Sequence, residues 1–172
     1  DSGSTAGAAG PEAQPKKKAK PNPGVLAAEQ TKASRLRHIQ VKFQDPGRPP
    51  PVDAAGRKVP VKTRQEAEAL LRRILRELTV EQEEMRRKPG ASKKLEDLAL
   101  KSGKWPRLCK EHSSCPTAQK GGNMCGDLGW VSREAQRKLS AEFQDAVAVL
   151  RPGMLSDIVA SADGLHVVQR IA

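Results

Sequence analysis

Two rhythms of apolar and polar residues run along this chain, and they separate predicted strands from predicted helices. Residues 36–43 and 165–171 alternate apolar with polar side chains, and 156–160 is a shorter extended segment. Such alternation is typical of a half-buried β-strand. A turn at Ala162-Asp163-Gly164 would join the last two strands. The pattern therefore predicts one strand early in the folded part and two at its end.

Three segments between these strands have helical spacing instead. In the first, Thr63 and Glu66 form a capping-box sequence, and apolar residues recur every three or four positions up to about Lys88. A second helix would follow Ser92 as its cap, with Leu95 among its inward residues. A third covers about 139–149, before Pro152 and the glycine after it. This order of elements predicts a small α+β domain with an antiparallel sheet.

The segments that connect these elements are rich in Pro and Gly. Residues 44–62 contain five prolines, so we expect a loop. Residues 101–113 are basic and interrupted by Gly103 and Pro106, and we expect an irregular insertion there. The Gly-rich run 121–129 predicts a loop or turn.

Composition divides the chain into a tail, residues 1–34, and a folded domain, residues 35–172. The tail lacks an apolar period and is expected to be disordered. Its basic cluster Lys16–Lys20 is either a nuclear import signal or nucleic-acid tether, or a solvated linker. With 31 Lys and Arg against 20 Asp and Glu, the net charge of +11 favours acidic partners.

Several classes of protein are disfavoured. No apolar run reaches the roughly 18 residues of a membrane span, and no signal-peptide pattern is present. Tyr is absent and only two Phe and two Trp occur, which argues against a stacking platform for single-stranded nucleic acid. Three cysteines, an odd number, argue for a reducing compartment, and we expect the nucleus or cytoplasm. The chain begins with Asp, which leaves an upstream module open.

The residues suited to chemistry stand on or between the predicted strands. His38 lies in the first alternating segment and His166 in the last. Between them lie Cys115-Pro116-Thr117-Ala118 and Gly126-Asp127-Leu128-Gly129-Trp130. A histidine in a strand is more often a core residue than a catalyst, so the flanking motifs decide how to interpret this one.

These motifs, together with Glu142-Phe143, Leu150-Arg151-Pro152-Gly153 and Gly164-Leu165-His166-Val167-Val168, resemble the parvulin family of peptidyl-prolyl cis/trans isomerases. The long Pro-rich loop and Cys115 resemble its eukaryotic, phosphate-directed (Pin-type) branch. The resemblance implies a four-stranded antiparallel sheet surrounded by about four helices. It also implies a rotamase that acts on X–Pro bonds in proteins without a cofactor.

The resemblance further implies roles for individual residues. The catalytic set would be His38, Cys115, His166 and Asp163, the last at a place often held by Ser. The pocket for the substrate proline would be Leu128, Leu139 and Phe143. The phosphate clamp would be Lys42 and Arg48, thinned because Gly47 replaces a neighbouring arginine, unless Arg57 or Lys58 compensates.

Other interpretations of the same residues stay open. Cys109, His112, Cys115 and Cys125 have a spacing that also fits a zinc site, against three independent thiols and a surface histidine. Leu139 and Phe143 are equally expected in an ordinary core, and Lys42 and Arg48 on an ordinary basic surface.

The sequence thus predicts a monomeric prolyl isomerase that prefers phospho-Ser/Thr-Pro or an acidic residue before proline. The alternative is a proline-peptide binding module with little turnover, tethered to nucleic acid or chromatin by its tail.

Overall fold

The computed structural model describes residues 33–47, 49–50, 52–53, 55–58 and 61–172 of the chain. Nearly all of the predicted tail, with its Lys16–Lys20 cluster, lies outside the described residues, and so does Arg48. Among the described residues, no helix is long and apolar enough to cross a membrane.

The centre of the domain is a four-stranded antiparallel sheet with the strand order β2-β1-β4-β3. The strands are β1 (Ser34–Val41), β2 (Asp127–Val131), β3 (Val159–Ser161) and β4 (Gly164–Arg170). The two longest strands, from opposite ends of the domain's sequence, are neighbours in the middle of the sheet, in a register that pairs His38 with Val168. The predicted α+β class and antiparallel sheet are confirmed.

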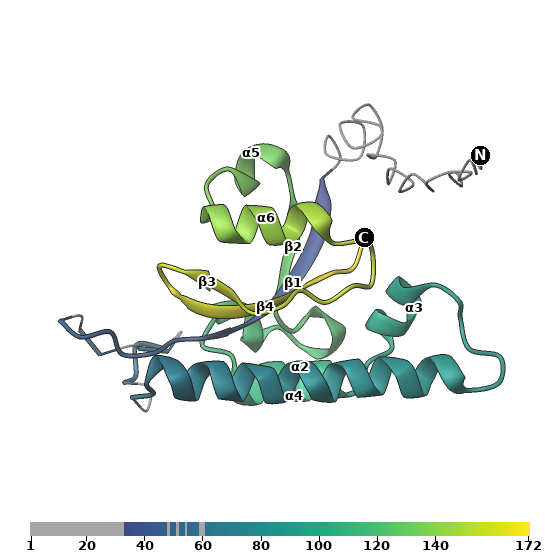
Figure 1. The fold of residues 1–172 in the computed structure, drawn as a ribbon, viewed down its shortest axis with the longest axis horizontal. Helices are drawn as coiled ribbons and strands as arrows, with labels where there is room; N and C mark the ends of the chain where they lie inside the picture. Colours follow the sequence, from purple (N-terminus) through teal and green to yellow (C-terminus); the bar gives the residue numbers. More distant parts are fainter. Residues whose placement is uncertain (1–32, 48, 51, 54, 59–60) are drawn as a thin grey trace, which may run out of the picture.

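Helices cover both faces of this sheet (Figure 1). The long helix α2 (Arg64–Arg87) and α4 (Lys104–His112) lie on one face, with α3 (Leu95–Leu100) near one end of α2. The helices α5 (Arg133–Gln136) and α6 (Ala141–Val149) lie on the other. Two short 3₁₀ turns, η1 (Pro116–Gln119) and η2 (Gly122–Met124), precede β2.

Because successive side chains of a strand point to opposite faces of the sheet, β1 and β4 contribute residues to two separate hydrophobic cores, one on each face. Ile39, Val41 and Val167 pack with α2 and α4. Leu36 and Val168 pack with Phe143 and Val147 of α6. His38 and His166 share the face of Leu36 and Val168, so the sheet register directs both rings toward α6.

The start of α2 is as predicted. The hydroxyl of Thr63 accepts a hydrogen bond from the Glu66 N–H (3.2 Å), and the Glu66 carboxylate accepts one from the Thr63 N–H (2.7 Å). The prediction that Ser92 caps the next helix was wrong. The cap position is Lys94, and the Ser92 hydroxyl instead bonds the Asp97 carboxylate (2.6 Å).

The expectation of an irregular insertion over 101–113 was also wrong, because most of it forms α4. Pro106 stands in the first turn of the helix, where a missing N–H costs little. Trp105 and Leu108 are buried on the inner face, and the Arg37 guanidinium lies 4.2 Å from the centre of the Trp105 ring. The Glu81 carboxylate accepts hydrogen bonds from the backbone N–H groups that begin the helix.

The Gly-rich run 121–129 was predicted as loop, yet its end forms β2 against β1. Gly126 permits this close approach: its φ is +78°, and a Cβ there would lie 2.4 Å from the His38 carbonyl oxygen. The first strand also begins and ends two residues earlier than predicted, at Ser34 and Val41.

Candidate functional site

One open groove of about 560 Å³ lies on the α6 side of the sheet. The predicted site residues that line it are His38, Lys42, Cys115, Leu128, Leu139, Phe143, Asp163 and His166. They come from β1, β2, β4, α6 and the connections after β1, before η1, before α6 and between β3 and β4. The fold therefore gathers into one concave surface the eight described residues to which the family resemblance gave a catalytic, proline-binding or phosphate-binding role, whereas Arg57 and Lys58 do not line it.

Two imidazole rings lie beneath this groove. The Nδ1 atoms of His38 and His166 are 3.2 Å apart, and the rings stack with their centroids 5.2 Å apart. Phe143 meets the His166 ring edge-to-face at 5.7 Å between centroids. Both histidines are buried, with exposed fractions of 6% and 5%. The two histidines therefore form a hydrogen-bonded pair, and an aromatic ring covers it.

The contact between the two Nδ1 atoms limits where the protons of the pair lie. In a pair of neutral rings one Nδ1 donates and the other accepts, so one ring is in the Nδ1–H form and the other in the Nε2–H form. Nε2 of His166 lies 2.7 Å from the Ser161 hydroxyl, which can donate or accept. Nε2 of His38 has no hydrogen-bond partner among the described residues.

Burial keeps both rings uncharged. Burial and, to a smaller extent, the neighbouring His166 lower the pKa of His38 to about 3. Burial likewise lowers the pKa of His166 to about 4, although the Asp163 carboxylate opposes the shift. At neutral pH neither ring carries a charge, so the pair presents Cys115 with fixed dipoles and no cation.

Cys115 is positioned by the two serines that precede it. The Gln40 N–H donates to the Ser113 hydroxyl (3.1 Å), and the Ser114 N–H donates to the Gln40 carbonyl (2.7 Å). This segment is thereby held along β1. The Thr117 hydroxyl then donates to the Cys115 sulfur at 3.1 Å, which orients the half-buried side chain at the groove.

Three apolar side chains form one wall of the groove. Phe143 is 3% exposed and belongs to the α6 core, whereas Leu128 and Leu139 are half-buried and pack against that core. A half-buried apolar side chain in a concave surface can contact a ligand as well as its own core. The wall is thus both core and groove lining.

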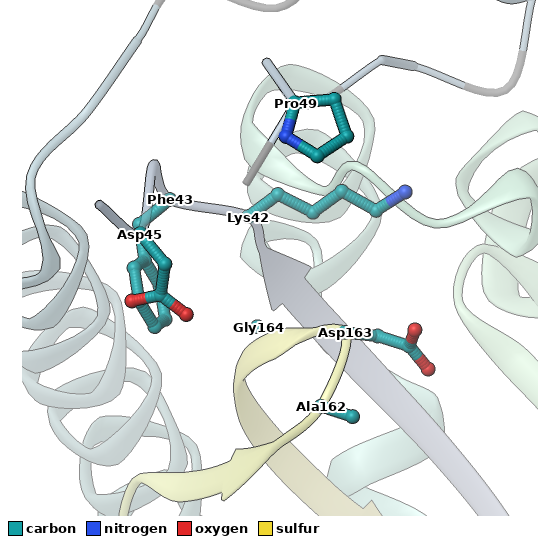
Figure 2. A pocket seen from close by; sticks show the side chains of 7 residues that line it. All are labelled: Lys42, Phe43, Asp45, Pro49, Ala162, Asp163 and Gly164. Carbon is teal, nitrogen blue, oxygen red and sulfur yellow. The ribbon is translucent and has the colours of Figure 1, made fainter. Parts of the chain in front are cut away.

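The charged rim of the groove adjoins a second, smaller cavity of about 160 Å³ (Figure 2). Lys42, Ala162 and Asp163 line both spaces. The Lys42 ammonium donates to the Val52 carbonyl at 3.3 Å, so the lysine reaches toward the loop after β1. Of the two residues proposed to compensate for Gly47, Arg57 bonds the Asp53 carboxylate at 2.8 Å.

The zinc alternative has no geometric support. Across the described part of the chain, no three His, Cys, Asp or Glu side chains form a group that could hold a metal ion. Cys109 and Cys125 are buried, and their thiols face backbone carbonyls of His38 and Ala118. Burial, with Cys125 nearby, raises the pKa of the Cys109 thiol.

Sequence reasoning missed the polar residues that support the site: Gln40, Ser113, Ser114, Thr117, Lys138 and Ser161. Of these, only Ser161 could have been found from the sequence pattern, through its position in the predicted hairpin. The short hairpin pairs Val159 with His166, and Ser161, two residues on, lies on the same face.

The two depressed histidine pKa values predict how stability depends on pH. Above about pH 6.5 the rings are neutral in the folded and unfolded chains, and their contribution is complete. As the pH falls below about 6.5, the histidines of the unfolded chain bind protons. In the folded chain His166 stays neutral down to about pH 4 and His38 down to about pH 3. The free energy of unfolding should therefore fall by about 2 kcal/mol per histidine between pH 7.5 and pH 5.

Urea unfolding at several pH values checks this prediction. His38→Gln or His166→Gln should flatten the pH slope by about one proton, whatever either does to stability at pH 7.5. His112→Gln, outside the groove, is the control and should change the slope less. Equal slopes in the wild type and both groove variants would contradict the buried neutral pair.

Comparisons with known proteins bear on the identity of this groove. The family model of the rotamase, PPIC-type PPIASE domain, matches residues 38–172. Among curated relatives, the peptidyl-prolyl cis-trans isomerase ESS1 of Saccharomyces cerevisiae is 38% identical over 71 residues, 41% of this chain and 38% of that protein. Peptidyl-prolyl cis-trans isomerase Pin1 of Malus domestica is 32% identical over 75 residues, 44% of this chain and 56% of that protein. The chain spans only about a third of ESS1 and of similar fungal relatives.

Solved structures agree on the fold. The crystal structure of the PPIase domain of TbPar42 has a TM-score of 0.56 at 22% identity and covers 81% of this chain and 99% of that one. The solution structure of TbPIN1 has a TM-score of 0.57 at 22% identity, covering 83% and 99%. With the family model matched from His38 to the C-terminal residue, the chain belongs to the parvulin family, the PPIC-type peptidyl-prolyl cis/trans isomerase domains.

Proposed function

We propose that this chain catalyses cis/trans isomerisation of X–Pro bonds in proteins, with a preference for phospho-Ser/Thr or another acidic residue at X. One observation carries the proposal: a single groove combines an apolar wall, a half-buried cysteine and a neutral histidine pair, with Lys42 at its rim. In this proposal the chain acts as a monomer in the nucleus or cytoplasm, on proline-containing, phosphorylated proteins.

The groove suits bond rotation because that reaction breaks no covalent bond. Amide resonance sets a barrier of about 18–20 kcal/mol, and resonance is lost when the amide twists. An apolar wall that holds the proline ring away from water disfavours the more polar planar ground state. Lowering the barrier by about 7 kcal/mol accelerates the exchange by about 10⁵.

The side chains divide this work. Leu128, Leu139 and Phe143 hold the proline ring. Cys115 lies beside the reacting carbonyl as a polar contact, oriented by Thr117. His38 and His166 keep that region rigid and uncharged. They need not transfer a proton, because rotation about the amide bond breaks no covalent bond.

The preference for a negative charge before proline rests on the rim. Lys42 lines the groove from the end of β1, and Lys138 lines it from the segment before α6. Both ammonium groups favour an anionic side chain at X. Arg48, the second member of the expected clamp, lies outside the described residues.

The nucleic-acid-tethered binding module is the alternative. It rests on the Lys16–Lys20 cluster and the net charge of +11. Salt-dependent nucleic-acid affinity that disappears when residues 1–34 are deleted, with negligible isomerase turnover, would favour it.

Exchange spectroscopy on X–Pro peptides tests the isomerase proposal. The wild-type protein should accelerate exchange, and Leu139→Ala should lower kcat/KM about 10-fold because the proline ring loses a contact surface. Val149→Ala removes an apolar side chain that is 75% exposed on α6 and should have no effect. Exchange at the uncatalysed rate with folded wild-type protein would end the isomerase proposal.

A panel of phosphorylated, glutamate-bearing and neutral peptides tests the charge preference. Relative to the neutral peptide, Lys42→Met should lower kcat/KM about 10-fold for the phosphopeptide and about 3-fold for the glutamate peptide, since phosphate carries nearly two charges. Lys110→Met, on the exposed side of α4, is the matched control. Equal wild-type rates on all three peptides would refute the preference but leave the isomerase proposal intact.

A further inference from the structure

Asp163 places a carboxylate on the same rim as Lys42. It lies in the turn between β3 and β4, is exposed, and lines both the groove and the smaller cavity beside it. In Figure 2 the side chains of Lys42 and Asp163 extend to the same side, one from the end of β1 and the other from the hairpin turn. Asp45 lines only the smaller cavity.

The backbone of Asp163 is held firmly in this position. Its carbonyl accepts a hydrogen bond from the Gln40 side chain (3.1 Å), and its N–H donates to the Ser161 hydroxyl (3.1 Å). Ser161 in turn is hydrogen-bonded to Nε2 of His166 and therefore belongs to the support of the groove. The backbone from which the carboxylate extends is therefore fixed at the rim. The negative charge of Asp163 also acts on His166, where it opposes the lowering of that histidine's pKa.

A fixed negative charge beside Lys42 changes which anions the rim prefers. Lys42 and Lys138 attract each negative charge at X, and the Asp163 carboxylate offsets part of that attraction. The attraction that remains favours an anionic over a neutral residue at X, whereas the added advantage of the second phosphate charge becomes small.

We propose that Asp163 is a specificity-determining residue that limits the preference for phosphate, so that Glu-Pro and Asp-Pro bonds are used nearly as well as phospho-Ser/Thr-Pro bonds. This inference rests on the proposed isomerase function and names its substrate class. This role replaces the catalytic one that the family resemblance implied for Asp163: its carboxylate acts on the charge of X, and the proline ring and the twisting amide are bound by other residues.

The charge of X provides the test, since an electrostatic role must scale with it. Four X–Pro peptides with phosphoserine, glutamate, alanine or lysine at X are compared at pH 7.5 and low ionic strength, using the full chain. Each kcat/KM is divided by the value for the alanine peptide with the same variant, so that a general loss of activity cancels.

Asp163→Asn should raise this ratio about 3-fold for glutamate and about 10-fold for phosphoserine, and lower it about 3-fold for lysine. The effect should shrink as salt is added, because the rim is exposed to solvent. Asp163→Glu should keep the wild-type pattern, and Asp145→Asn, an exposed carboxylate on α6 outside the groove, should leave all ratios unchanged.

The outcomes separate the two proposals. If Asp163→Asn leaves the four ratios at their wild-type values, or shifts them without regard to charge, the inference is wrong while the isomerase function stands. If the wild-type protein accelerates none of the four peptides, the proposed function itself fails.

Discussion

The hydrogen bond between His38 and His166 is the contact on which the site depends. It joins the first and last strands of the domain, whose register pairs Gln40 with His166 and His38 with Val168. The two rings are therefore diagonal neighbours on one face of the sheet. A slip of one residue would move one of them to the opposite face, so the contact and the register require each other.

Burial of this pair determines the kind of chemistry that the groove offers. Two neutral imidazoles, covered by Phe143, form a floor of fixed dipoles with no mobile charge. Fixed dipoles in a partly dry groove suit a reaction whose transition state differs from its ground state in polarity rather than in bonding. Formal charges lie at the rim, on side chains such as Lys42 and Asp163, where in our proposal they select the substrate. The proposed mechanism thus assigns substrate selection and bond rotation to different parts of the groove.

Local patterns allowed the strands β1 and β4 and the helix α2 to be predicted, because alternation and the Thr63 capping box are encoded within each segment. The strand β2 was not predicted, because it forms only through pairing with β1, which Gly126 permits. The helix α4 was not predicted either, because Gly103 and Pro106 are typical of a loop, whereas the burial of Trp105 in the core stabilises a helix there. Family motifs supplied the apolar wall, whereas the supporting hydroxyls of Ser113 and Ser161 act across contacts distant in sequence.

The measurement that tests the pair most directly is the ¹⁵N spectrum of the imidazole nitrogens over a range of pH. The hydrogen bond between the two Nδ1 atoms requires one ring in the Nδ1–H form and the other in the Nε2–H form, both neutral at pH 6. Observation of one ring in each form, without titration down to about pH 5, would establish the account. A ring of the pair that titrates near pH 6.5, or two rings in the same tautomeric form, would contradict it.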